Sequence, residues 1–508
     1  MDKLNATLED LSTRLSSDLP ELLSPTTLSL GLLAITALVI FRKSMPPQRP
    51  ATAAVNETRD GARTLSSGTR TSPKHDTTQE HVDMNKDRDF GDWTPVQFRY
   101  PSIEACTSKL VDVKPIPYRP FRWGTYYVTM GIRSMPWNDW IELDRDHQSY
   151  HRIKAHRIQT RGDKVIRVLR GEGNPNAGSV RDGVEAAVEL VHELAEYLSR
   201  RYPGEFQIVR HAQRVASSPE QELEGGATPF ADWGWYGLPA IKSIYITSLG
   251  VSFTLPLSVA DGDRAPERAM EIAGLLIQDD LALMIEGVDG KYYFQAGSIC
   301  LPGFWRLQDK IGLPLDDIHL TGNVPQYRER LQASLERFFR RLPVDKPVIR
   351  NNYFFQTNAN VDPDTVDPEE VGWAKSTLGA EDGYEHGSGT HGSGNQNGAR
   401  ELETTVDAIR LRSERQTLRR LPRSGAVVFT IRTYLTRIVD LGQEKGVPGR
   451  MASALRSWTP DVAGYKGRER GGWWGPLLAY LDEQHGAQVA RGEVGAGEEK
   501  DDGARYPL

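Results

Sequence analysis

The sequence predicts an α+β fold, because its helical and strand-like segments follow one another without the regular alternation of a doubly wound sheet. A helical repeat of apolar residues spans 184–198, and a hairpin pattern spans 281–296. Two segments rich in β-branched and aromatic residues, 347–356 and 426–434, add further strands. We therefore expect strands and helices to share one folded region.

Composition sets limits on the class of protein. The chain has 508 residues, and its apolar share of 38% is low because polar tracts flank a region that can still form a globular core. A net charge of −6 is mild for this length and gives no case for a nucleic-acid partner. Cys106 and Cys300 are too few for a disulfide framework and suit a reducing compartment.

An apolar run near the N-terminus predicts a membrane anchor. Residues 26–41 carry no charge, Arg42 and Lys43 follow directly, and the short segment before the run, 1–25, is acidic. This charge order argues against a cleaved signal peptide and places the bulk of the chain in the cytosol. We expect a single-pass transmembrane helix at 26–44 in the endoplasmic-reticulum membrane, whose thin bilayer suits a short span. The alternative is a buried or interfacial amphipathic helix.

Composition also divides the rest of the chain. Residues 45–89 are polar with almost no large apolar side chains, so they cannot offset the entropy of ordering, and they predict a disordered tether. We expect the folded domain at 90–485 and a disordered tail at 486–508. A tract rich in Gly, Ser, His and Asn at 379–398 indicates a surface insertion.

Two helices are predicted from apolar spacing. In the 184–198 segment, the apolar residues share one face, the glutamates lie mostly opposite, and Tyr202-Pro-Gly ends the helix. His192 lies on this helix, where we expect a structural or solvent-facing histidine rather than a ligand. The second helix, at 324–341, has Pro325 in its first turn and repeats aromatic and leucine residues.

The hairpin prediction depends on its turn. Residues 281–286 and 292–296 are strand-like, and the sequence GVDGK between them supplies glycines where a positive φ is needed. The hairpin should therefore form locally.

Some motifs carry less weight. GSGTHG at 387–392 matches the dinucleotide fingerprint, but it follows no strand and opens no helix, so we discount it. His147 and His151 stand four residues apart, so on a helix they could share a metal with Asp144 and Asp146, although this spacing is common by chance.

A cluster of arginines precedes the last predicted strand, and it includes Arg412, Arg415, Arg419, Arg420 and Arg423. The default interpretation of such a cluster is a solvated basic face. The functional alternative is an anion clamp, because guanidinium groups bind carboxylates in a bidentate manner.

Several blocks in order resemble one family, the haem-dependent oxidative N-demethylases. The most specific block is ERQTLRRLPRSG at 414–425, which continues to Tyr434. The others are MGIR at 130–133, WIELD at 140–144, IQDDLALM at 277–284, AGSICLP at 296–302, WRLQDKIG at 305–312, PLDDIH at 314–319, PQY at 325–327, RNNY at 350–353 and YKG at 465–467. Their shared order carries the resemblance.

The resemblance implies a PAS-like domain in which a mixed sheet and flanking helices hold haem b. With dioxygen, such a domain demethylates a small alkylamine oxidatively. Other subunits of the bacterial form handle reduced pyridine nucleotide and flavin. Since this chain shows no flavin or nicotinamide motif of its own, we expect a separate electron donor such as an NADPH- and flavin-dependent reductase.

Site residues are also implied by the resemblance. We expect His319 to bind the haem iron, because neutral imidazole is the commonest protein donor to iron, with Cys300 as the alternative. The apolar neighbours of Cys300 favour a buried, inert thiol instead. Further residues are expected to hold propionates, orient oxygen or position the amine: Arg419 and Arg420 for the cofactor, and Glu414, Arg415 and Arg350 for catalysis.

Departures from the compact bacterial pattern leave the substrate open. Residues 204–271 and the 379–398 tract look inserted, and the first contains aromatic residues at 233–237 and an apolar run at 248–255 that we expect in the core rather than in a substrate channel. Two alternatives remain open: a non-catalytic PAS-like sensor of haem or a small ligand, and an oxygenase acting on a larger natural product.

Overall fold

The structure, a computed structural model, describes most of the expected folded domain. The described residues are 87–212, 233–303, 306–357, 404–469 and 472–495. The expected anchor at 26–44, the insertion at 379–398 and all but the last residues of the tether lie outside them. Within the described part, no helix has both the length and the apolar character that crossing a membrane requires.

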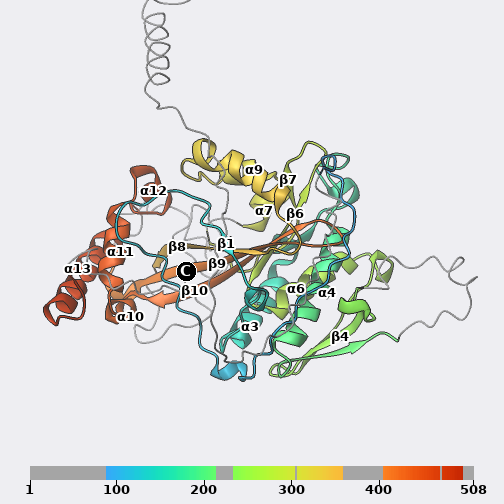
Figure 1. Cartoon of the computed structure of the whole chain (residues 1–508), viewed down its shortest axis with the longest axis horizontal. Coiled ribbons are helices and arrows are strands. Elements are labelled where there is room, and N and C mark those ends of the chain that lie inside the picture. The colour runs from blue at the N-terminus through green and yellow to red at the C-terminus, as the bar shows by residue number, and fades with distance from the viewer. Residues whose placement is uncertain (1–86, 213–232, 304–305, 358–403, 470–471, 496–508) are drawn as a thin grey trace, which may run out of the picture. The chain divides into compact units, whose positions relative to one another are not determined.

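The described elements mix helices and strands, as the sequence predicts. The α-helices are α3 (His147–Arg161), α4 (Val184–Arg201), α6 (Ala265–Leu276), α7 (Leu307–Lys310), α8 (Leu315–Thr321), α9 (Gln332–Arg341), α10 (Ile438–Gln443), α11 (Val447–Arg456), α12 (Pro460–Tyr465) and α13 (Trp474–Ala490). The strands are β1 (Arg133–Ser134), β2 (Ile166–Val168), β3 (Phe206–Arg210), β4 (Ile241–Ile246), β5 (Val251–Thr254), β6 (Asp280–Glu286), β7 (Tyr292–Ser298), β8 (Val348–Thr357), β9 (Ile409–Arg420) and β10 (Val427–Arg437). The α+β prediction is confirmed (Figure 1).

The main sheet has seven described strands in the order β1-β8-β9-β10-β6-β7-β2. Each described pairing is antiparallel, so the expectation of a mixed sheet is wrong. The physical reason is local connectivity, because β6 with β7 and β9 with β10 are joined by short turns that only antiparallel neighbours allow. The predicted hairpin at 281–296 is confirmed as β6 and β7.

Strand β9 corrects the prediction for the arginine cluster. The segment that we expect to precede a strand is itself a strand, paired with β8 on one side and, from Arg410 to Arg420, with β10 on the other. All twelve of its residues are buried, so the solvated basic face is wrong. Charged residues are almost never fully buried unless they are paired, so each arginine must find a partner inside the protein.

Helix α4 packs between the main sheet and a small one. It confirms the predicted helix at 184–198, but Glu189, Glu193 and Glu196 on its second face are buried too. Glu189 accepts hydrogen bonds from the backbone of Arg423 and Ser424, and Glu193 pairs with Arg419 of β9. Glu196 pairs with Arg210 of the small sheet, β3-β4-β5, which the 204–271 region supplies and which packs against α4. Trp233 and Trp235 of this region are buried in the same core, as expected.

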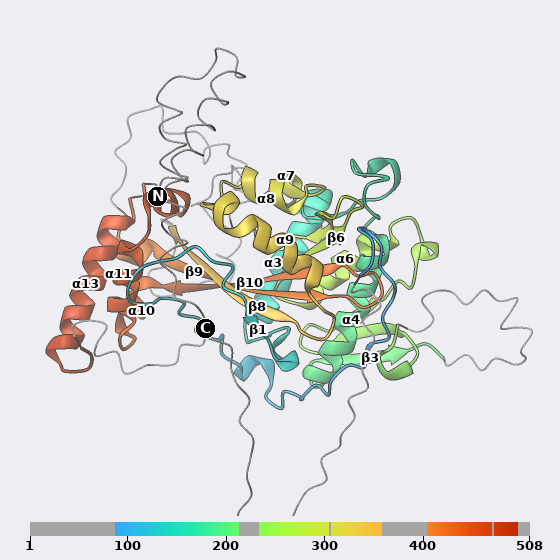
Figure 2. The same cartoon turned by 45° about the horizontal axis from the view of Figure 1, so that its top comes forward.

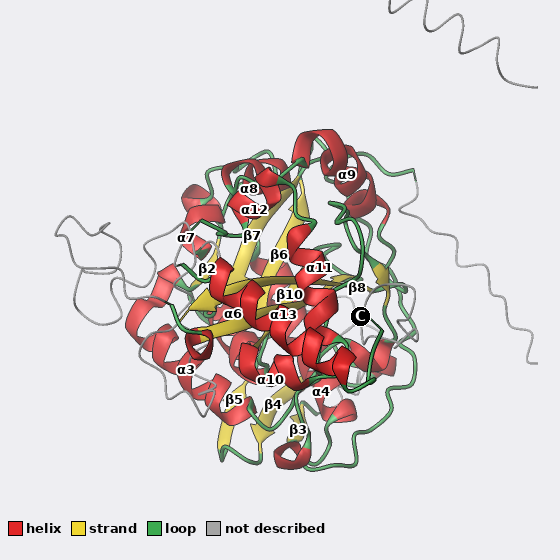
Figure 3. Ribbon diagram, turned by 90° about the vertical axis from the view of Figure 1, so that its left-hand side faces the viewer, coloured by secondary structure: helices red, strands yellow, loops and turns green. Residues whose placement is uncertain are grey.

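The other face of the main sheet carries a second layer, in which α7, α8 and α9 lie together (Figure 2). The predicted helix at 324–341 is observed as a π-helical turn, Tyr327–Leu331, followed by α9. It begins later than expected because Asn323 and Gln326 adopt left-handed conformations, with φ of 54° and 55°. A third apolar cluster packs α10 to α13 against the ends of β8 and β9 (Figure 3).

Candidate functional site

A cavity of about 240 Å³ lies between the main sheet and the α8–α9 layer. Its floor is one row of side chains across four neighbouring strands. The register pairs Arg350 of β8 with Gln416 of β9, Gln416 with Ile431 of β10, and Ile431 with Asp280 of β6. All four residues line the cavity, so the sheet register fixes their spacing.

Most of the cavity wall is apolar. The apolar side chains come from the strands and from the α8–α9 layer: Ala282, Met284, Phe294, Ile299, Leu301, Leu315, Ile318, Leu331, Leu335, Phe339, Leu418 and Phe429. The segment 125–132, which lies outside the helices and strands, closes another side with Tyr126, Val128, Thr129, Met130 and Ile132. Such a wall excludes water and suits an apolar ligand with a few polar groups.

Polar groups gather at one end around Glu414. Its Oε2 accepts hydrogen bonds from Gln416 Nε2 at 3.0 Å and from Asn352 Nδ2 at 3.3 Å. Arg412 Nε lies 3.8 Å from Oε1. The carboxylate is therefore held in one orientation by two amides, and it lines the cavity.

Two cations face this carboxylate. Arg350 is half-buried, and its Nε has no hydrogen-bond partner in the described part of the chain. Burial lowers the pKa of Arg350, and the nearby charge of Glu414 opposes that shift. Lys466, which follows α12, is also buried and lines the cavity. An unpaired buried donor is costly, so the site suits an anionic group that would accept from it.

His319 lines the cavity from α8. Its Nδ1 lies 2.7 Å from the carbonyl oxygen of Leu315, one turn earlier, and its ring stacks on Tyr327 with centroids 4.7 Å apart. Because a carbonyl only accepts, Nδ1 carries the proton and Nε2 keeps its lone pair. Burial lowers the pKa of His319 to about 4, so the imidazole is neutral at physiological pH. This is the state in which histidine binds metals.

Asp280 marks the opposite end of the floor. Its carboxylate accepts hydrogen bonds from the backbone N–H groups of Cys300, at 2.9 Å, and Leu301, at 2.8 Å. Burial is the main cause that raises its pKa. The carboxylate thus holds the turn after β7 against the start of β6.

Three of the predicted site residues do not reach the cavity. Side chains on a strand alternate between faces, so Arg415 and Arg419 point away from Glu414 and into the α4 side of the sheet. Arg415 lies 2.9 Å from Glu142, and Arg419 pairs with Glu193 while lying over the rings of Trp137 and Trp140. Their expected contact with cofactor or substrate is therefore corrected to a structural role.

Arg420 lies on the cavity face but beyond its end. It donates to the carbonyl oxygens of Leu342 and Gly425, each at 2.7 Å, and to the hydroxyl of Tyr292 at 2.9 Å. These acceptors join the β9–β10 turn to the chain after α9. The expected propionate contact of Arg420 is thus corrected: its hydrogen bonds connect the β9–β10 turn to the segment after α9.

Cys300 and the histidine pair are also accounted for. Cys300, the alternative iron ligand, is fully buried, and burial raises the pKa of its thiol to about 12, which fits the inert cysteine that its apolar neighbours favour. His147 Nε2 and His151 Nδ1 contact the carbonyl oxygens of Leu276 and Leu275, at 3.1 and 3.0 Å, and so cap the C-terminus of α6. Among the described residues no group of three metal-binding side chains occurs.

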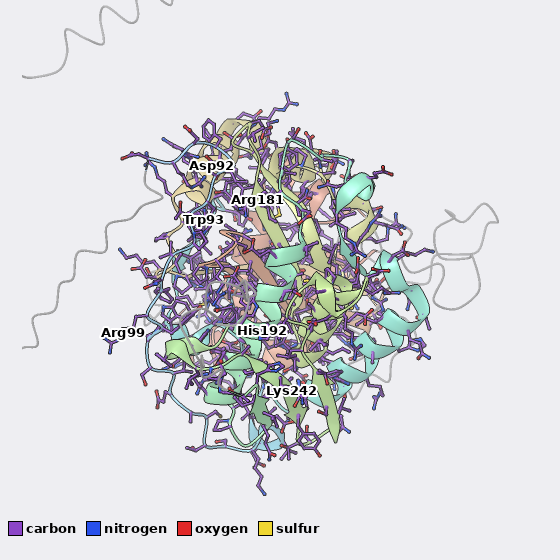
Figure 4. The ribbon with its side chains drawn as sticks, turned by 90° about the vertical axis from the view of Figure 1, so that its right-hand side faces the viewer. Asp92, Trp93, Arg99, Arg181, His192 and Lys242 are labelled. Atoms are coloured by element: carbon purple, nitrogen blue, oxygen red, sulfur yellow. The ribbon has the colours of Figure 1, made fainter. Side chains whose placement is uncertain are left out.

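His192 has a structural role, as expected. It is buried, its Nε2 lies 3.0 Å from the carbonyl oxygen of Pro256, and its ring stacks on Trp233. In Figure 4 it lies well inside the molecule, whereas Arg99 projects from the edge.

The structure thus brings His319, Arg350 and Glu414 to one cavity and adds residues that sequence reasoning missed. The additions are Asp280, Asn352, Gln416, Tyr465 and Lys466. Each lies in a block that carries the family resemblance, which is the signal that could have found them. What the sequence alone could not give is which residues of a block face the cavity.

A comparison with family models gives one match. The model described as haem-dependent oxidative N-demethylase, alpha subunit-like, matches residues 131–477. The match covers more than half of the chain, and it includes β8, β9, α8 and α12, which supply the polar end and His319.

Proposed function

This chain belongs to the haem-dependent oxidative N-demethylase, alpha subunit-like family, and on that premise we propose that the cavity holds haem b and that dioxygen there oxidises a small methylated amine. The observation that carries the proposal is the neutral, oriented His319 in an apolar cavity whose polar end presents Arg350 and Glu414. A PAS-like arrangement is part of the same proposal.

The donor set fits a haem. The apolar wall matches a macrocycle, His319 offers Nε2 to iron, and the unpartnered Nε of Arg350 suits a propionate. The cavity of about 240 Å³ is smaller than the roughly 300–1,000 Å³ of ligand sites, so a wall must move outward to admit the macrocycle. We propose that this wall is the segment 125–132, which lies outside the helices and strands.

The residues that line the cavity have different proposed roles. When bound, haem supplies the iron that activates dioxygen. Glu414 accepts a hydrogen bond from the ammonium group of a protonated amine and so orients its methyl group, while Gln416 and Asn352 hold the carboxylate in place. The apolar wall keeps bulk water from the reacting methyl group.

The electrons and the location are also proposed. We propose that a separate NADPH- and flavin-dependent reductase donates the electrons, since the sequence predicts no strand before the dinucleotide-like GSGTHG motif and no helix after it. We further propose that residues 26–44 anchor the chain in the endoplasmic-reticulum membrane, with the folded domain in the cytosol.

An absorption spectrum tests the haem proposal. The purified full-length chain is supplied with haem, freed of excess by gel filtration, and recorded between 350 and 700 nm, roughly the range of porphyrin bands. We expect a Soret band that stays with the protein. Its absence would sink the proposal.

Turnover then separates the alternatives. Haem-loaded protein with a competent reductase and dimethylamine should release formaldehyde in a dioxygen-dependent reaction. Retained haem without amine oxidation would favour the non-catalytic sensor. Oxidation of a larger natural product in place of the amine would identify the third alternative.

A further inference from the structure

The polar end of the cavity contains a lysine that the proposed function does not use. Lys466 is 4% exposed, and its Nζ donates to the carbonyl oxygen of Tyr353 at 2.5 Å and to Asn352 Oδ1 at 3.3 Å. The rings of Tyr353 and Trp458 lie beside it, with their centroids 4.6 and 5.5 Å from Nζ. The ammonium group is therefore fixed in position on the cavity wall.

The hydrogen bonds of Lys466 leave one donor for a ligand. A protonated lysine has three N–H groups, and the two acceptors above are neutral. In the part of the chain that the structure describes, no carboxylate forms an ion pair with Lys466, and Glu414 acts on it only at longer range. Buried charges are ordinarily paired, so this cation lacks its counter-charge.

We propose that Lys466 holds the exchangeable proton of this cavity: as an ammonium it donates a hydrogen bond to an anionic group bound beside the haem position, and it loses that proton as the pH rises. This inference rests on the proposed function in one respect: the haem is needed to bring the anion into the cavity. The ligand chemistry is that of a small anion or carboxylate.

The surrounding groups support this assignment. Burial lowers the pKa of Lys466 to about 7, with Glu414 opposing the shift and Arg350 adding to it. The other titratable groups that face this end are Tyr126, Tyr353 and Tyr465, and burial raises the pKa of each. At the far end of the floor, burial raises the pKa of Asp280, and on α8 it lowers that of His319 to about 4. Near neutral pH the charge of the polar end therefore changes at Lys466.

A matched lysine provides the control. Lys154 of α3 is 0% exposed and also donates to two acceptors, the carbonyl oxygens of Ile277 and Asp279, but it does not line the cavity. The test compares the full-length wild type with Lys466→Met and Lys154→Met. Both substitutions remove a buried ammonium and two hydrogen bonds.

The first measurement needs no haem. Urea midpoints are recorded at pH 6 and at pH 9.5, on either side of the folded-state pKa of Lys466, which is about 7. Because the pKa of Lys466 is lower in the folded chain than in the unfolded chain, its contribution to stability rises with pH between the two values. We expect the midpoint of the wild type to rise with pH relative to that of Lys466→Met, and to rise by more than it does relative to that of Lys154→Met. A pH-independent difference for Lys466→Met overturns the proposal.

The second measurement uses azide as the anion. Azide affinity of the haem-loaded protein is read from the shift of its absorption bands between about pH 6 and pH 8.5. In the wild type and in Lys154→Met the affinity should fall about tenfold more over this range than in Lys466→Met, the effect of one charged hydrogen bond. Equal falls in all three proteins would overturn the anion contact.

The two measurements separate this inference from the haem proposal. If the chain retains no haem, the proposed function fails, and the urea midpoints still decide whether Lys466 releases its proton near neutrality. If haem is retained and Lys466→Met behaves like Lys154→Met in both assays, the haem proposal stands and Lys466 is a structural tie between α12 and β8.

Discussion

Glu414 is oriented by hydrogen bonds from two amides, and Arg412 Nε lies 3.8 Å from its carboxylate. A carboxylate held in this way is suited to a cationic ligand. Its strand neighbour Arg415 pairs with Glu142 on the opposite face. The difference between the two residues follows from strand geometry alone.

Replacing the carboxylate by an amide tests this role. Glu414→Gln keeps the shape of the side chain but removes its charge, so we expect the KM for dimethylamine to rise about tenfold while haem is retained. The measurement is formaldehyde release against amine concentration. The matched control is Glu286→Gln, because Glu286 is a buried carboxylate that pairs with Arg340 away from the cavity. An unchanged KM in Glu414→Gln would remove this residue from amine binding.

The iron ligand is tested by a pair of substitutions. His319→Ala should abolish or shift the Soret band, because it removes the neutral imidazole that lines the cavity. Cys300→Ala should leave the spectrum unchanged, because that thiol is buried outside the cavity wall. The reverse result, a change only in Cys300→Ala, would assign the iron to the thiolate.

The pair formed by Arg419 and Glu193 tests the structural role assigned to the arginines. Glu193→Gln leaves the buried guanidinium without its counter-charge, and breaking one buried pair costs about 3–5 kcal/mol. Urea denaturation should show a loss of this size in the free energy of unfolding, with haem affinity per folded molecule unchanged. A loss of haem affinity in a well-folded variant would show that Arg419 contributes to haem binding.

At the scale of elements, the β9–β10 turn controls how the sheet meets the N-terminal part of the domain. Gly425 has a φ of 72°, and a Cβ at this position would run into the ring of Trp93. The ring nitrogen of Trp93 also donates to the carbonyl oxygen of Pro422 at 3.0 Å. The turn and Trp93 therefore pack as one unit.

Gly425→Ala should consequently destabilise the domain. Strain at a left-handed position costs on the order of 1–3 kcal/mol, and the clash with Trp93 adds to it. Gly475→Ala, in α13 and with open space around its Cβ position, is the control and should leave the thermal midpoint unchanged or slightly raised. Equal midpoints for the two variants would show that the turn can relax.

Elements with a clear period were predictable, and those with an unusual composition were not. The β6–β7 hairpin and α4 follow from alternation and from helical spacing. Strand β9 was missed because its many arginines indicate a solvent-exposed segment. No local signal in the sequence shows that Glu142 and Glu193 pair with Arg415 and Arg419. In the same way, His319 and Glu414 could be selected from the sequence, whereas the sheet register that places Arg350 beside Gln416 could not.

At the scale of the whole molecule, buried histidines and buried carboxyl groups have opposite effects on how stability depends on pH. Burial lowers the pKa of His147 and of His192 to about 4, so each contributes stability that is lost as the pH falls from about 6.5 toward 4. Burial raises the pKa of Asp279 to about 6 and that of Glu189 to about 7, so these groups favour the folded state as the pH falls through the same window. The two effects offset each other.

Replacing the two histidines should reveal the effect of the carboxyl groups on the pH dependence of stability. The variant His147→Leu with His192→Leu will be less stable at every pH, because two carbonyl contacts are lost. Its urea midpoint should nevertheless rise relative to the wild type as the pH falls from about 6.5 to 4.5, since the carboxylates then act without opposition. A constant difference between the two proteins across this range would contradict the shifted histidine pKa values.

The alternation of β9 also bears on how this protein could acquire new substrates. Glu414, Gln416 and Leu418 face the cavity, while Arg415, Thr417 and Arg419 face the α4 core. Directed evolution could therefore randomise the first set and keep the second fixed, which would change selectivity at little cost to folding. An insertion or deletion of one residue would exchange the two sets, so variation in this strand is restricted to point substitution.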